Sequence, residues 1–295
     1  MTKTRRTTLP RATDRLELGR QRLCVSPLCL GAVRSPDTVL AAFDAGINFF
    51  FVTADMHWPL YEGLRQGLSR LFARRRGIRD EVVVAATAYV SQPEFCWMPF
   101  KEVLYAVPGL KRIDVTVAGG AYGDEIGTRL GVYREHLATG HVGVRGIGTS
   151  FHDRNAAAES VRNASVDVAF IRYNPSHTGA RRDVFPHVPD ERRTPLYGFT
   201  SLSRVVGRAR CCELGLGSDY WHPSPVDYYR FALTPPEMDG LLCAPQTPRE
   251  VASLCRALER GPLDEEEESY LVDLAALDEG RAMITTTPND QRSGP

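Results

Sequence analysis

The chain contains very little lysine. Lysine and arginine together number 36 of 295 residues, but only Lys3, Lys101 and Lys111 are lysines, so the other 33 are arginines. Lysine is the cation whose pKa proteins lower for Schiff-base and proton-transfer chemistry, whereas the guanidinium of arginine stays charged and binds carboxylates and phosphates. A mechanism that depends on lysine therefore has three candidates, and one of them lies in the N-terminal segment.

Other absences exclude further classes of protein. The 36 acidic residues balance the 36 basic ones, which argues against a nucleic-acid binder. No apolar run is long enough to span a membrane, and no apolar signal segment follows the N-terminus. The seven cysteines lack the spacing of zinc ligands and the number and context of a disulfide framework. We therefore expect a cytoplasmic protein without a metal, nucleic-acid or membrane partner.

What the chain does contain is a regular alternation of strand-like and helix-like segments. A hairpin is predicted over Leu16–Cys24, and eight strands over Leu28–Gly31, Asn48–Thr53, Val82–Thr87, Asp114–Val117, Gly143–Gly148, Val166–Tyr173, Leu196–Thr200 and Gly240–Cys243. Segments with helical periodicity lie between most of them, among them Val39–Ala45, Leu64–Arg74 and Ile126–Leu137. This alternation predicts an α/β fold, a (β/α)8 TIM barrel with a short N-terminal β-hairpin.

Composition also predicts the boundaries of the barrel. Residues 1–14 and 281–295 are polar and poor in apolar side chains, and we expect a disordered leader and a disordered tail. Residues 15–280 would form the barrel. A doubly wound sheet is the competing fold, but Gly31–Arg34 is not the glycine-rich turn that such a sheet usually carries after its first strand.

Polar side chains follow several predicted strands. Asp55 and His57 follow the second strand, Tyr89 the third, His152 the fifth and Arg172 the sixth. In a barrel these strand ends share one rim, where histidines and carboxylates can exchange protons. We predict that Asp55, His57 and His152 are acid/base groups and that Arg34 or Arg172 holds an anionic small-molecule substrate.

The segment after the eighth strand has the pattern of a helix N-terminus. Thr247-Pro248-Arg249-Glu250 has the pattern of a capping box with proline at the first helical position. The free N–H groups of such a terminus can bind a phosphate, here with help from Arg249. Simple capping would also explain the pattern.

The order of these segments resembles the aldo/keto reductase superfamily from about residue 16 to residue 277. The resemblance is carried by Leu18-Gly19, Val25–Gly31, Ala45–Phe50 leading into Thr53-Ala54-Asp55, Ile147–Ser150, Arg172-Tyr173-Asn174 and Gly261-Pro262-Leu263. It implies a (β/α)8 barrel that reduces carbonyls with NADPH, using an Asp, Tyr, Lys and His tetrad at the barrel mouth. The chain departs from this tetrad at all four positions, which are Val52, His57, Ala88 and Gly119.

The resemblance also implies a binding site for NADP(H). Ser150 matches the residue that holds the nicotinamide carboxamide, and Phe199 falls where an aromatic ring stacks on the nicotinamide. Phe151 and Phe170 replace polar partners of the carboxamide, and each unpaired buried amide group costs roughly 1–3 kcal/mol. The loop that resembles the adenosine-phosphate site contributes Thr247, Arg249 and Glu250.

Three functions remain open from the sequence. The first is an enzyme repurposed for a non-redox acid/base step, such as dehydration, isomerisation or cyclisation of a small biosynthetic intermediate. The second is an atypical NADPH-dependent oxidoreductase acting on a carbonyl or imine, with His57 as the proton donor. The third is a non-catalytic ligand-binding or partner protein. We favour the first because the predicted rim keeps many ionisable groups.

Overall fold

The protein is an eight-stranded parallel barrel. The computed structural model describes residues 4–53, 55, 57–121, 125–191 and 194–280, so the predicted tail, residues 281–295, lies outside the described residues. The strands close in the order β10-β3-β4-β5-β6-β7-β8-β9. Their bounds are β3 Leu28–Leu30, β4 Phe49–Thr53, β5 Val83–Ala88, β6 Val115–Ala121, β7 Gly146–Phe151, β8 Val168–Arg172, β9 Leu196–Phe199 and β10 Gly240–Cys243. Each of the eight predicted strands is confirmed.

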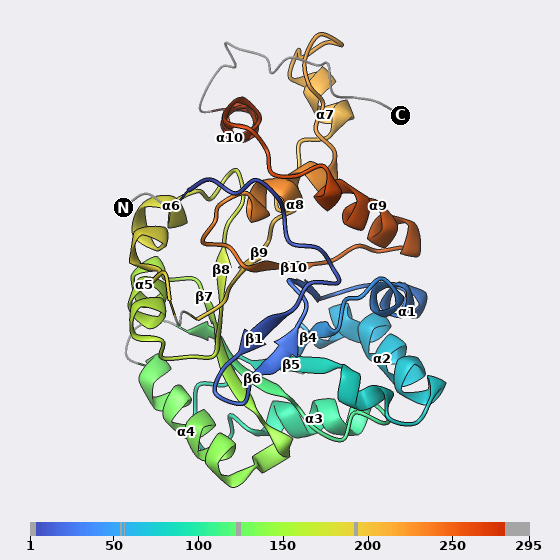
Figure 1. The fold of residues 1–295 in the computed structure, drawn as a ribbon, viewed down its shortest axis with the longest axis vertical. Coiled ribbons are helices and arrows are strands. Elements are labelled where there is room, and N and C mark those ends of the chain that lie inside the picture. Colours follow the sequence, from blue (N-terminus) through green and yellow to red (C-terminus); the bar gives the residue numbers. More distant parts are fainter. Residues whose placement is uncertain (1–3, 54, 56, 122–124, 192–193, 281–295) are drawn as a thin grey trace.

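Helices surround the strands (Figure 1). Their bounds are α1 Pro36–Asp44, α2 Glu62–Arg74, α3 Met98–Ala106, α4 Glu125–Thr139, α5 Arg154–Asn163, α6 Ala180–Asp183, α7 Arg208–Glu213, α8 Pro225–Leu233, α9 Pro248–Glu259 and α10 Glu265–Asp278. None of the described helices is long and apolar enough to cross a membrane.

The barrel interior is filled by side chains from alternate strand positions. Phe49 and Phe51 of β4 face inward, whereas Phe50, between them, packs against the surrounding helices. The ring of Phe170 on β8 lies 5.1 Å from that of Phe51 and 5.6 Å from that of Tyr197 on β9. Because both faces of a parallel strand are covered, the strands are nearly continuous apolar runs in the sequence.

The predicted hairpin is also confirmed, and it closes one end of the barrel. β1 Leu16–Leu18 and β2 Leu23–Val25 form a two-stranded antiparallel sheet. Their buried side chains Leu18, Leu23 and Val25 pack onto the inward-facing residues of the strands. Since the hairpin precedes β3 directly, it covers the amino-terminal ends of the strands and leaves the carboxyl ends for a site.

Part of the predicted leader is anchored on the barrel. Leu9 and Ala12 are each only 5% exposed and belong to the main hydrophobic core. Arg6 donates hydrogen bonds to the carbonyl oxygens of Leu233 and Pro236. Residues 4–14 are therefore not a free leader, because two apolar residues in a polar segment are enough to attach it. Residues 1–3 lie outside the described residues.

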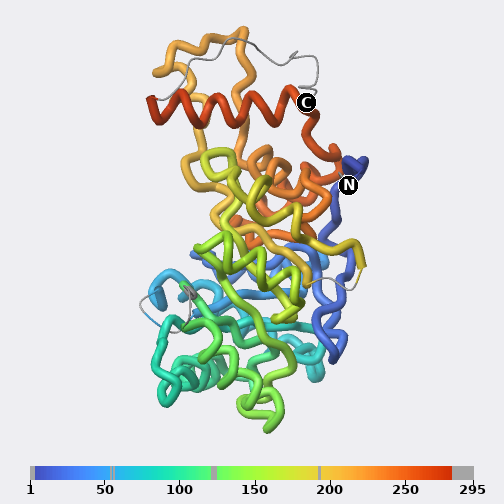
Figure 2. Tube along the Cα trace, turned by 90° about the vertical axis from the view of Figure 1, so that its left-hand side faces the viewer, coloured from blue at the N-terminus to red at the C-terminus, as the bar shows by residue number. Residues whose placement is uncertain are grey.

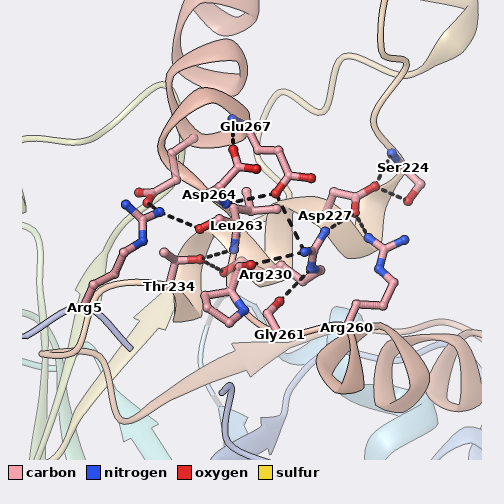
Figure 3. Close-up of polar contacts among 12 residues, drawn as sticks. Arg5, Ser224, Asp227, Arg230, Thr234, Arg260, Gly261, Leu263, Asp264 and Glu267 are labelled. Atoms are coloured by element: carbon pink, nitrogen blue, oxygen red, sulfur yellow. Dashed lines mark hydrogen bonds and ion pairs between the residues drawn. The ribbon is translucent and has the colours of Figure 1, made fainter. Parts of the chain in front are cut away.

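The long connection from β9 to α8 and the helix α10 pack together at one end of the molecule (Figure 2). They share a small core of their own, made of Val206, Cys211, Leu216, Tyr270 and Leu274. Figure 3 shows the polar contacts that fasten this part to the barrel. Arg230 of α8 donates to Gly261 O at 2.9 Å and lies 3.2 Å from Asp227, while Arg5 lies 2.6 Å from Glu268 of α10.

Candidate functional site

Four of the predicted site residues stand at the carboxyl ends of strands. Asp55 and His57 follow β4, His152 follows β7, and Arg172 is the last residue of β8. The structure brings them together as two pairs, Asp55 with His57 and His152 with Arg172. Because β5 and β6 separate β4 from β7 in the closed barrel, the two pairs stand on different sides of the rim.

The carboxylate of Asp55 is held by three donors. Its Oδ1 accepts the Thr53 hydroxyl at 2.8 Å and the backbone N–H of His57 at 3.2 Å, and its Oδ2 accepts the backbone N–H of Tyr89 at 3.1 Å. Only 12% of the side chain is exposed. Since the donors come from the ends of two neighbouring strands, the position of the carboxylate is set by the barrel itself.

His57 completes an acid/base pair with this carboxylate. Its Nδ1 lies 3.4 Å from Asp55 Oδ1, and 41% of its side chain is exposed. When the Nδ1–H points to a carboxylate, Nε2 is the basic nitrogen of the ring and can take up a proton. Asp55 and His57 therefore form the arrangement that general acid/base catalysis requires.

Two tyrosines stand beside this pair. The ring of Tyr89, after β5, lies 5.1 Å from that of His57. Tyr61, in the 3-10 turn Trp58–Tyr61, packs against the barrel interior, and burial, with smaller effects of Tyr89, Cys29 and Asp55, raises the pKa of its phenol. The phenol of Tyr61 therefore keeps its proton at neutral pH. Sequence reasoning missed it, although it lies in the same loop as Asp55 and His57.

Tyr89 occupies space beside Gly119, the position that the resemblance aligns with the tetrad histidine. A Cβ added to Gly119 would lie 3.0 Å from the Tyr89 ring and 2.6 Å from Thr87 Oγ1. A side chain at position 119 is therefore incompatible with this placement of Tyr89. The structure places a phenol next to the position where the resemblance implies an imidazole.

No lysine among the described residues lies where the resemblance implies an ammonium group. Ala88, at the position where the resemblance implies lysine, is fully buried. Lys101 lies on α3 with its Nζ 4.2 Å from the centre of the Trp97 ring, and Lys111 precedes β6, at the opposite end of the strands. The described residues also hold no group of three or more His, Cys, Asp or Glu that could bind a metal ion.

The second pair combines an imidazole with a guanidinium. His152 Nδ1 lies 3.2 Å from a terminal nitrogen of Arg172, and its ring lies 5.4 Å from that of Phe199 in an edge-to-face contact. Burial, and then the charge of Arg172, lowers the pKa of His152. The imidazole is therefore neutral at pH 7 and accepts a hydrogen bond from Arg172, which is an exposed residue.

The residues that the resemblance assigns to nicotinamide binding are only partly suited to that role. Ser150 and Phe199 lie at the carboxyl ends of β7 and β9, 7% and 8% exposed. Phe151 packs outward into the helical layer, and Phe170 is fully buried in the barrel interior. Neither phenylalanine can bind a carboxamide, so Ser150 would be left to bind it.

The residues implied to hold an adenosine phosphate are already used in capping α9. Thr247 Oγ1 accepts the backbone N–H of Glu250 at 3.2 Å, as the capping pattern predicts, and Glu250 Oε2 accepts the backbone N–H of Gln246 at 2.8 Å. The Glu250 carboxylate and the Thr247 hydroxyl thus cap the start of α9. Arg249 is exposed on the first turn.

The fold resembles solved structures of aldo-keto reductases. The holo form of one from Bacillus halodurans superposes with a TM-score of 0.67 and 14% identity, over 95% of this chain and 100% of that chain. One from Bombyx mori, solved in complex with NADP, gives a TM-score of 0.62 and 16% identity, over 88% of this chain and 92% of that chain. At these identities the likeness shows a shared fold. No family model and no curated protein matches the chain.

Proposed function

We propose that this aldo-keto-reductase-like barrel is an enzyme that catalyses a non-redox acid/base step on a small anionic intermediate of a biosynthetic pathway in the cytoplasm. The observation that carries the proposal is the pairing of Asp55 with His57 at 3.4 Å, on a rim where none of the described lysines stands. Dehydration, isomerisation and cyclisation all require a proton to leave one atom and return to another, and a histidine oriented by a carboxylate performs both transfers.

Each group at the rim has a part in this proposal. His57 Nε2 takes the proton from the substrate, and Asp55 stabilises the imidazolium that forms. The same imidazolium then returns the proton to the product, and His57 regains its neutral form. Arg172 binds the anionic group of the substrate through the donors that His152 leaves free. The step conserves protons and needs no oxidant or reductant.

Solvent exchange tests the proposal with a panel of candidate substrates. The protein is incubated in D2O with small hydroxy- and keto-carboxylates and their phosphate esters, and deuterium incorporation is followed by NMR. We expect exchange with at least one compound, lost about 10²–10⁴-fold in His57→Ala. His187→Ala is the matched control, because His187 hydrogen-bonds Arg162 of α5, away from this pair. Full exchange in His57→Ala would refute the proposal.

A second candidate is an NADPH-dependent oxidoreductase acting on a carbonyl or imine. It is favoured by Ser150 and Phe199 at the carboxyl ends of their strands and by the NADP bound to the Bombyx mori reductase. If it holds, NADPH raises the melting temperature, since a ligand at 100 times its Kd adds about 2.7 kcal/mol of stability. Ser150→Ala should reduce that shift. An unchanged melting temperature at millimolar NADPH and NADP contradicts this candidate.

A further inference from the structure

Arg129 of α4 is a buried cation with an unusual set of partners. Its side chain is 2% exposed. It donates one hydrogen bond to Gly119 O at 2.9 Å and another to Ala88 O at 2.5 Å. Among the described residues no carboxylate lies within ion-pair distance of it, and its Nε has no hydrogen-bond partner.

The other buried arginines are different. Arg65, Arg79 and Arg230 are 5–7% exposed, and each contacts a carboxylate: Glu62, Asp114 and Asp227 in turn. Figure 3 shows Arg230 beside Asp227. A buried charge is costly unless it is paired or hydrogen-bonded. Among the described residues, the two carbonyl oxygens of Gly119 and Ala88 accept the hydrogen bonds of the Arg129 guanidinium.

One of these carbonyls belongs to the peptide group that joins Ala88 to Tyr89. The N–H of the same peptide group donates to Asp55 Oδ2 at 3.1 Å. The peptide group is planar and conjugated, so a cation on its oxygen makes its N–H a stronger donor. A single peptide group thus lies between the guanidinium of Arg129 and the carboxylate of Asp55, with its dipole aligned to both.

The position of this peptide group is itself constrained. The ring of Tyr89 packs over Gly119 and Gly120, where an added Cβ would lie 3.0–3.4 Å from it. Gly119 also supplies the second carbonyl that Arg129 contacts. Arg129 therefore joins the ends of β5 and β6 through its two hydrogen bonds, and the ring of Tyr89 packs over the end of β6.

We propose that Arg129 is a positioning residue that acts on Asp55 and His57 through the Ala88–Tyr89 peptide group. The side chain of Ala88 carries no charge. The guanidinium of Arg129, on α4, instead contacts the backbone carbonyl of Ala88. Arg129 strengthens the hydrogen bond from Tyr89 N–H to Asp55 and so fixes the carboxylate that orients His57. The role assigned to this pair rests on the proposed function, whereas the hydrogen-bond coupling does not.

Amide NMR measures the coupling without any substrate. In Arg129→Met we expect the Tyr89 amide proton to move upfield and to exchange faster with solvent, because its hydrogen bond to Asp55 weakens. Arg129→Lys should restore most of the shift. Arg79→Lys is the matched control, since Arg79 donates to Val82 O at the other end of β5. The control should lower the melting temperature and leave the Tyr89 amide unchanged.

A second variant keeps the test decisive if Arg129→Met does not fold. Asp55→Asn removes the charge at the other end of the coupling and should move the carbonyl carbon resonance of Ala88 and the guanidinium resonances of Arg129. Unchanged Tyr89 resonances in folded Arg129→Met, or unchanged Ala88 and Arg129 resonances in Asp55→Asn, would overturn the proposal. If the resonances move but His57→Ala keeps full exchange activity, the proposed function fails and the coupling stands.

Discussion

The ring of Tyr89 lies against Gly119, so that an added Cβ on the glycine would stand 3.0 Å from the ring. We therefore expect Gly119→Ala to displace Tyr89 and to lower the free energy of unfolding by about 1–3 kcal/mol, the usual cost of overpacking. Denaturant unfolding measures the loss. Gly131→Ala in α4 is the matched control: its Cβ meets nothing within 4 Å, and alanine there should stabilise the helix by about 0.5–1 kcal/mol. Equal stabilities of the two variants would contradict the close contact.

His152 should titrate below its ordinary pKa of 6.5. Burial is the main cause and the charge of Arg172 the second, so Arg172→Gln should raise the pKa of His152 only part of the way back. Histidine proton NMR over pH 4–8 measures both values. A His152 midpoint that Arg172→Gln leaves in place would exclude the charge contribution.

The lowered pKa of His152 makes the free energy of unfolding depend on pH. The unfolded chain binds a proton to His152 at a higher pH than the folded chain does, so the contribution of His152 to stability is complete above about pH 6.5. This contribution declines as the pH falls from about 6.5 toward the pKa of His152 in the folded protein. Below that pKa the contribution does not change further. We expect His152→Gln to flatten this part of the stability profile measured by urea unfolding between pH 7 and pH 5.

Leu9 tests whether the N-terminal segment is anchored. Because Leu9 is 5% exposed within the main core, Leu9→Ala should cost about 2–5 kcal/mol, in the range of buried leucine truncations. The control is Arg11→Ala, since Arg11 is exposed and its side chain should contribute within about 0.5 kcal/mol. Thermal unfolding of both variants measures the difference. If Leu9→Ala left the melting temperature unchanged, the attachment would be contradicted and the disordered leader that the composition predicts would be favoured.

Local patterns predicted most of the barrel. The strand runs, the helices around Leu64–Arg74 and Ile126–Leu137, and the Thr247 cap could be found because apolar spacing and capping chemistry are local. α3, α5 and α8 were not predicted as helices. The attachment of residues 4–14 was missed because it depends on partners more than 200 residues away in the sequence, such as Leu233.

The candidate site was predicted as a set of residues and not as an arrangement. His57 and Asp55 are two positions apart, so their pairing follows a short turn, and the sequence could place both on the rim. The pairing of His152 with Arg172 depends on how the strand ends meet in the closed barrel. Tyr61 lies in the same loop as Asp55 and His57, and its burial depends on the barrel interior that it packs against.

The sequence by itself determined the alternation of strands and helices, the scarcity of lysine and the absence of a charged side chain at position 88, since each follows from residue identity and local spacing. Only the tertiary structure shows which charged group contacts the backbone at position 88. A buried guanidinium reaches the Ala88 carbonyl from α4, and the neighbouring N–H reaches Asp55, because barrel closure brings together residues 34 and 41 positions apart in the sequence.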